Sequence, residues 1–164
     1  MSSDIHIKLE TIDGDSLDEG HAGEIELLSA SHGSSRNIGS YSSGGSATQE
    51  PPHLQDFVFT KTVDKASPKI QGALWNGTNI ATAKLTIDKQ DGQGGKVGYV
   101  TYEFEKVHIS SYSVGASTGG GAPLETVSFA FAKITYLYSP TSTQTGAAEG
   151  QITAGWDLEL NKPV

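Results

Sequence analysis

Hydrophobic and polar side chains alternate along most of the chain, which is the pattern of half-buried β-strands. The alternation is clearest over residues 5–10, 24–27, 56–63, 81–88 and 152–160. Successive side chains of a strand point to opposite faces, so each of these segments presents one apolar face to a core. The pattern predicts an all-β protein.

Two longer segments change the phase of their alternation. Over 100–109 the apolar positions switch from even to odd numbers between Phe104 and Val107, and over 127–138 they switch from odd to even. A change of phase within a continuous strand requires a bulge or a sharp bend. Closed or strongly coiled sheets need such corners, so we expect a barrel or a tight sandwich rather than a flat sheet.

One helix is predicted, over 67–76. Ser67 is placed as its N-cap, Pro68 occupies the first helical position, and Asn76-Gly77 is a typical helix end. Apolar side chains repeat from Ile70 at a helical spacing. Because a helix of about ten residues is not stable alone, it must pack on the strands.

Stretches rich in Gly and Ser separate the strands at 33–50, 91–95 and 115–121. The second has the composition of a hairpin turn. A loop of about 18 residues without secondary structure is unusual inside a compact domain. It is either a loose excursion or an arm that reaches a neighbouring subunit, and composition favours neither. The length of 164 residues predicts a single domain over 1–164, with an extended loop at 34–50.

The charge of the chain excludes some partners. The net charge is −8, and residues 1–30 hold eight acidic side chains against one lysine. Nucleic-acid binding needs a basic surface, which this chain lacks. No apolar run is long enough for membrane insertion. The first residues lack the basic and apolar regions of a classical signal peptide, and the absence of cysteine excludes disulfides and thiolate metal sites.

The sequence motif that would indicate catalysis lacks the neighbouring elements that it requires. Residues 115–119 match the G-x-S-x-G pattern of a nucleophile elbow, which needs a following helix and usually a later histidine. Gly and Pro follow instead, and the last histidine is His108. An enzyme with Ser117 or His32 as its catalytic residue is kept only as a minor alternative. We expect a protein that is not an enzyme and has no catalytic residue.

No cofactor or metal site is predicted either. Residues 13–19 resemble the start of a calcium loop, but Leu17 and Asp18 occupy the positions that need Asp or Asn and then Gly, so a solvated acidic turn is expected. No P-loop or complete dinucleotide motif is present. None of the histidines has metal-ligand spacing, and all are interpreted as surface or turn residues: His6, His21, His32, His53 and His108.

An ordered set of motifs spans nearly the whole chain, at 19–33, 56–68, 83–87, 127–134 and 155–162. The second runs from Phe-Thr-Lys to Ser-Pro, the fourth contains Phe-Ala-Lys, and the last begins Gly-Trp-Asp. Together they resemble the haemolysin-coregulated proteins (Hcp), the tube subunits of type VI secretion systems of Gram-negative bacteria.

The resemblance implies a two-sheet β-barrel with one flanking α-helix, similar to phage tail-tube proteins. It implies a homo-hexameric ring, stacked rings that form a tube, and effector proteins carried in the channel as by a chaperone. Sheath and tip proteins of the secretion machine are the other implied partners. The protein would be cytoplasmic before firing and then secreted without a cleaved signal peptide. The alternative function is a tail-tube protein of a phage or phage-like contractile particle.

The resemblance also assigns roles to residues. Ser31 matches a position that faces the channel and touches cargo, and Ser29, two residues earlier, is expected on the same face. The loop 34–50 resembles the arm that contacts neighbouring rings, and the acidic turn 13–19 is expected at a solvated rim. The residues assigned to the inter-ring contact are Ser40, Tyr41, Ser42, Gly44 and Gly45.

Overall fold

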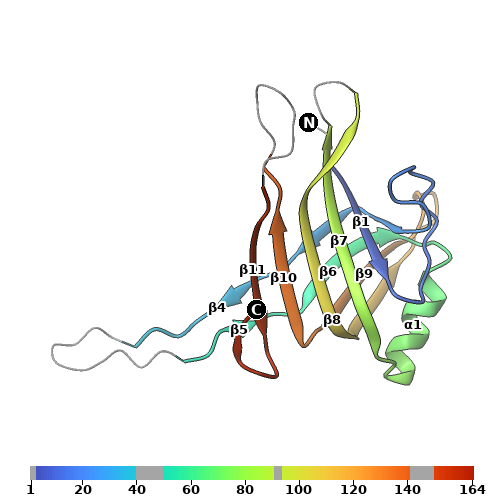
Figure 1. Cartoon of the computed structure of the whole chain (residues 1–164). Coiled ribbons are helices and arrows are strands. Elements are labelled where there is room, and N and C mark those ends of the chain that lie inside the picture. The colour runs from blue at the N-terminus through green and yellow to red at the C-terminus, as the bar shows by residue number, and fades with distance from the viewer. Residues whose placement is uncertain (1–2, 40–49, 91–93, 141–149) are drawn as a thin grey trace, which may run out of the picture.

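The computed structural model describes residues 3–39, 50–90, 94–140 and 150–164, and their regular structure consists of β-strands and one short helix (Figure 1). The predicted all-β class with one flanking helix is therefore confirmed. The elements are β1 Ser3–Leu9, β2 Ile25–Leu27, β3 Ser29–Ser31, β4 Ser34–Ser35, β5 His53–Leu54, β6 Phe57–Thr62, α1 Ser67–Asn76, β7 Ile80–Gln90, β8 Lys96–Gly115, β9 Leu124–Ala130, β10 Lys133–Tyr138, β11 Ile152–Asp157 and β12 Lys162–Pro163.

The strands form two layers that share the long strand β8. The first layer has the order β12-β11-β10-β8-β7-β1-β2, and the second has the order β3-β6-β9-β8. Leu28 alone separates β2 from β3, and its N–H donates to the carbonyl of Thr60 in the second layer. The two layers are thus joined on both sides and enclose a common core, without a closed ring of strand ladders among the described residues.

Strand β8 bends where the sequence pattern changes phase. Its first half pairs with β7 and β10, and its second half, from His108, pairs with β9. Lys106 at the bend has a left-handed backbone (φ 53°), and the register with β9 shifts between Ile109 and Ser111. These irregularities let Phe104 and Val107 both point into the core although their positions differ by three, an odd number. The predicted corner in this strand is confirmed.

The second phase change has a different cause. Residues 127–138 do not form one bent strand, because the chain leaves the strand conformation at Phe131-Ala132. The segment before this break is β9 in the second layer, and the segment after it is β10 in the first. The expectation of a continuous strand was therefore wrong here. A change of sheet reverses which side chains face the core as effectively as a bulge does.

The core is built around aromatic rings. All five phenylalanines of the chain are buried, and their ring centroids form a contact network with separations between 5.0 and 6.4 Å. Such offset and edge-to-face contacts add to the free energy gained by burying the rings. These five side chains come from both layers and hold them together: Phe57, Phe59, Phe104, Phe129 and Phe131.

Helix α1 differs from the sequence prediction at its start. Ala66 is the N-cap, and no side chain caps the helix. Ser67, predicted as the cap, lies inside the helix and is buried, with its hydroxyl turned toward Glu125. The predicted end is confirmed, because Gly77 adopts a left-handed conformation (φ 63°) and its N–H reaches the carbonyls of the last turn.

The last predicted strand is shorter than its pattern. It ends at Asp157, whose carboxylate accepts the N–H of Leu160, and the chain turns back so that β12 pairs with β11. Leu158 and Leu160, predicted to continue the alternation, are exposed. Side-chain alternation by itself does not reveal a turn stabilised by a side-chain hydrogen bond.

The long Gly- and Ser-rich loop begins as an extended ribbon. Strands β4 and β5 pair with each other and project from the body of the molecule (Figure 1). Arg36 lies over the ring of Trp156, 5.7 Å from its centroid, and links the base of the ribbon to β11. The described part of this loop is a ribbon that projects from the body, and its contact with a neighbouring subunit stays a prediction.

Candidate functional site

Hydroxyl side chains cover the outer surface of the second layer. Strand pairing places Ser29 opposite Thr60, Thr60 opposite Thr126, and Thr126 opposite Ser113, so one row crosses four strands. Residues that lie opposite each other project to the same face. The neighbouring row contains Ser31, Val58, Ser128 and Ser111. We call the seven hydroxyl-bearing residues of the two rows the hydroxyl face.

The local sequence explains why this face is polar. In β6, Phe57 and Phe59 are buried while Thr60 and Thr62 point outward, and β9 alternates Val127 with exposed Thr126. The apolar partners of the alternation fill the core, and the hydroxyls remain on the outside, except that Ser128 is covered by its neighbours and is buried. No position in the two rows carries a charged side chain.

Some of these hydroxyls satisfy each other. Ser29 Oγ and Thr60 Oγ1 are 2.5 Å apart, and Ser111 Oγ lies 2.5 Å from Ser128 Oγ. Ser110, at the edge of the face, donates to Asp56. A hydroxyl that already has a partner gains little by binding a passing protein. The hydroxyl face is therefore polar and hydrated, but it does not bind other proteins strongly.

The predicted channel residues fall on this face. Ser29 and Ser31 are both exposed on β3, and Ala30 between them points toward the core. Their role in a channel stays a prediction. Thr60, Thr126 and the β8 serines were missed, although the alternation of Thr with Phe in 57–62 indicated an outward hydroxyl surface. The five residues assigned to the inter-ring contact, within 40–45, lie outside the described residues.

The histidines do not all lie on the surface. His53 and His108 are exposed, as expected, but His6 is only 3% exposed and that expectation was wrong. A loop between β1 and β2 covers it, and the His21 ring of that loop stacks on the His6 ring. His32 is half-buried against Phe57 and Phe131, and this burial lowers its pKa.

His21 has a carboxylate at each ring nitrogen. Its Nδ1 is 2.7 Å from Glu24, and its Nε2 is 2.6 Å from Asp88. Burial lowers the pKa of His21, but the hydrogen bond to Glu24 and the charges of Asp88 and Glu24 outweigh it and raise the pKa above its ordinary value. His6, His21 and Asp88 offer ligand atoms within 4.8 Å of one another. The sequence did not predict this cluster, because the three residues are far apart along the chain.

The G-x-S-x-G motif has no catalytic context. Strand β8 ends at Gly115 and β9 begins at Leu124, and no helix lies between them. The strand-to-helix turn that exposes a nucleophilic serine is absent from this part of the chain. In the acidic turn, Asp15 and Asp18 pair with Lys65 and Lys96.

The family is decided by the comparisons with known proteins. Residues 6–138 match the family model described as "Type VI secretion system effector, Hcp". The chain belongs to the Hcp family. The protein Hcp1 of Pseudomonas aeruginosa is 34% identical to it over 161 residues, which cover 98% of each chain.

Solved structures of Hcp-like proteins have the same fold. A type six secretion system protein superposes with a TM-score of 0.91 at 33% identity and covers 99% of this chain and 100% of its own. Hcp1 from Salmonella typhimurium has a TM-score of 0.75 at 30% identity over 100% of both chains. The described residues contain no helix with the length and apolar character needed to span a membrane.

Proposed function

We propose that this chain is the tube subunit of a type VI secretion system and acts by assembling and holding proteins rather than by catalysis. Six copies form a ring, the rings stack into a tube, and effector proteins occupy the channel. A sheath and a tip complex act on the tube from outside. The subunit is made in the cytoplasm and is exported with the tube, without a cleaved signal peptide.

The observation that carries this proposal is the hydroxyl face. A channel through which proteins pass needs a wettable lining without strong binding sites. The row Ser29, Thr60, Thr126 and Ser113 provides uncharged polar groups across four strands. The opposite side of the same strands is the apolar core, so this surface is rigidly supported. We assign the hydroxyl face to the channel wall.

Exposed apolar side chains support contacts between subunits. Ile152 and Leu160 are each more than 60% exposed near the β11 edge, and Tyr136 on β10 is also exposed. Ile152 lies at the start of β11 and Leu160 in the turn after its end, so exposed apolar side chains occur at both ends of this strand. Head-to-tail contacts of this kind close into a ring when the rotation between copies is suitable.

The projecting arm supports the stacking of rings. The β4–β5 ribbon extends away from both layers (Figure 1). An extended segment that finds few contacts within its own chain gains stability by contacting a neighbour. We assign Ser40, Tyr41, Ser42, Gly44 and Gly45 to this inter-ring contact.

The first test is the mass of the purified protein, measured by light scattering across a range of concentrations. The proposal expects a species of six times 17.2 kDa. A strict monomer at every concentration contradicts a ring that forms on its own. Dimers or tetramers that persist contradict sixfold closure.

The channel assignment is tested with two matched substitutions. Thr126→Arg places a long charged side chain in the middle of the hydroxyl face, and Thr78→Arg places the same side chain on an exposed turn after α1. Both variants should keep the mass of the ring. Effector export should fall only for Thr126→Arg, because a charge in the lining binds or repels cargo. Equal export by both variants overturns the assignment.

The absence of catalysis is tested at Ser117. A fluorophosphonate probe labels serines that a neighbouring base activates. Ser117 should stay unlabelled in the folded ring, and mass spectrometry of tryptic peptides provides the readout. Stoichiometric labelling of this residue contradicts a purely structural role.

A further inference from the structure

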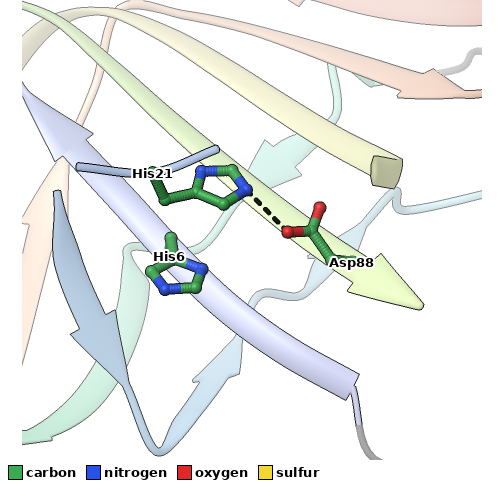
Figure 2. Close-up of side chains that lie close together, drawn as sticks. All are labelled: His6, His21 and Asp88. Carbon is green, nitrogen blue, oxygen red and sulfur yellow. Dashed lines mark hydrogen bonds and ion pairs between the residues drawn. The ribbon is translucent and has the colours of Figure 1, made fainter. Parts of the chain in front are cut away.

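Three potential metal ligands from three different segments meet on the face of the first layer that points away from the core, where the β1–β2 loop covers them. His6 comes from β1, His21 from the loop between β1 and β2, and Asp88 from the end of β7 (Figure 2). The register pairs His6 with Thr86, so Asp88 is its diagonal neighbour on the same face. The register between β7 and β8 shifts beside Asp88, where a bulge locally redirects the strand.

The cluster is buried and one of its polar atoms has no partner. His6 is 3% exposed and Asp88 is 4% exposed. His6 Nδ1 forms no hydrogen bond with any described residue. Figure 2 shows one nitrogen of the His6 ring turned toward the side on which Asp88 lies. A buried nitrogen without a partner is costly, so a ligand at this atom would remove that cost.

The surroundings favour a cation. His21 lies between two carboxylates, Glu24 at Nδ1 and Asp88 at Nε2, so one imidazole faces two negative charges. An open pocket beside the cluster provides an entry path from solvent. Carboxylates outnumber ammonium groups in its lining, with Asp18, Glu19, Glu24 and Asp88 against Lys84 and Lys96.

The ring arrangement defines how a metal would bind. The His6 and His21 rings are stacked, with centroids 4.4 Å apart and planes 7° apart. A metal ion lies in the plane of each imidazole, at about 2.0–2.1 Å from the nitrogen, so parallel stacked rings cannot share one ion. One ring must rotate. His6 is held in β1, whereas His21 belongs to a loop and is the ring that turns.

We propose that His6, His21 and Asp88 form a Zn²⁺ site. Two imidazoles and one carboxylate are a typical donor set for this ion, with water as the fourth ligand. The unpartnered Nδ1 of His6 is its ligand atom. His21 coordinates through Nε2 and exchanges its hydrogen bond to Asp88 for a shared ion. Glu24, on the same loop and 2.7 Å from Nδ1 of His21 before the ring turns, would accept the Nδ1–H of the turned ring and hold the tautomer that leaves Nε2 free.

Bound zinc would fasten the β1–β2 loop to the sheet. His21 is the residue of this loop that reaches both the His6 ring and Asp88 across from β7. The ion would therefore stabilise the folded subunit, because a site assembled from three segments does not exist in the unfolded chain. This inference does not depend on ring formation or on the proposed function.

The test uses the chain without a histidine tag, freed of metal with a chelator and titrated with ZnCl₂ in a calorimeter. One ion per chain should bind, and the melting temperature should rise. His21→Gln retains hydrogen-bonding capacity and Asp88→Asn retains shape, and both should abolish binding. Glu24→Gln should weaken it by roughly 10–100-fold, as expected of a residue that orients a ligand. His53→Gln and His108→Gln, at exposed histidines, should bind like the wild type.

A second measurement needs no substitution. Zinc should shift the imidazole NMR resonances of His6 and His21 and leave those of His53 and His108 in place. Co²⁺ should give the visible absorption of a four-coordinate site. Failure of Zn²⁺ to bind, unchanged binding by His21→Gln, or resonance shifts confined to the exposed histidines would each overturn the proposal.

Discussion

Lys61 and Glu125 face each other across β6 and β9, with Nζ and Oε2 2.5 Å apart and both side chains fully buried. Ser67 at the start of α1 donates to the same carboxylate oxygen at 2.8 Å, and Tyr112 of β8 donates to the other oxygen. Asp64 is a second carboxylate for Lys61, at 2.9 Å. The pair thus connects the second layer to the helix.

Removing one charge of this pair should destabilise the fold strongly. Lys61→Met retains much of the side-chain length but leaves Glu125 as an uncompensated buried charge. Breaking a buried pair in this way costs about 3–5 kcal/mol in the free energy of unfolding. Urea denaturation monitored by circular dichroism measures the loss.

An exposed pair provides the matched control for that substitution. Lys65 and Asp15 are 3.7 Å apart with both side chains 57% exposed. Lys65→Met should change the free energy of unfolding by less than about 1 kcal/mol. The double variant Lys61→Met with Glu125→Leu should recover part of the loss. Equal effects at Lys61 and Lys65 would show that burial does not determine the strength of the pair.

The raised pKa of Tyr112 predicts that the protein loses stability at high pH. Burial, together with the hydrogen bond to Glu125 and its charge, raises the pKa of Tyr112 from 10.0 to about 12. The unfolded chain releases this proton first, so stability is complete below pH 10.0 and falls as the pH rises toward about 12. Urea midpoints of the wild type and Tyr112→Phe should differ most at about pH 9 and below, and should converge only as the pH approaches about 12.

The prediction for Tyr112 is contradicted if the urea midpoints of the wild type and Tyr112→Phe differ by the same amount at every pH in this range. Such a gap would mean that the tyrosine contributes packing alone. The ultraviolet absorbance of phenolate provides an independent readout. The difference spectrum between the two proteins should show one tyrosine that ionises last.

The lowered pKa of His32 predicts that the protein loses stability at low pH. Burial lowers the pKa of His32 below its ordinary value of 6.5, and its Nδ1 has no partner among the described residues. The unfolded chain takes up this proton first, so the contribution is present above pH 6.5 and is lost as the pH falls through the folded pKa. His32→Phe, which can pack on Phe57 and Phe131, should melt at a temperature that changes less with acidification than that of the wild type. His53→Phe should keep the wild-type pH dependence.

Gly14 is expected to tolerate no side chain. A Cβ there would lie 2.3 Å from the carbonyl oxygen of Glu24 and 2.6 Å from Cα of Ile25. Gly14→Ala must displace backbone and should cost about 1–3 kcal/mol, as overpacking does elsewhere. Gly20 in the same loop has only Asp18 Oδ1 nearby, at 3.9 Å, so Gly20→Ala should change the free energy of unfolding by less than about 0.5 kcal/mol. Urea denaturation of both variants tests the difference, and similar values would show that the loop adapts without cost.

The sequence was sufficient where structure follows from local rules. Alternation located most strands, because successive side chains of a strand always point to opposite faces. Gly77 predicted the helix end because glycine adopts the left-handed conformation required there. The ordered motifs predicted the Hcp family. Ser67 was misplaced as a cap, since its hydroxyl serves Glu125, a partner far away along the chain.

Only the tertiary structure decided which residues meet across strands. The row Ser29, Thr60, Thr126 and Ser113 depends on the registers of three strand pairs. The alternation of side chains within one strand does not predict any of these registers. The contact between His21 and Asp88 likewise depends on a loop closing over β1. Sequence patterns report which face a side chain takes, because that depends on neighbouring residues alone. Which side chains share that face depends on pairing between distant segments, and pairing is set by the packing of the whole core.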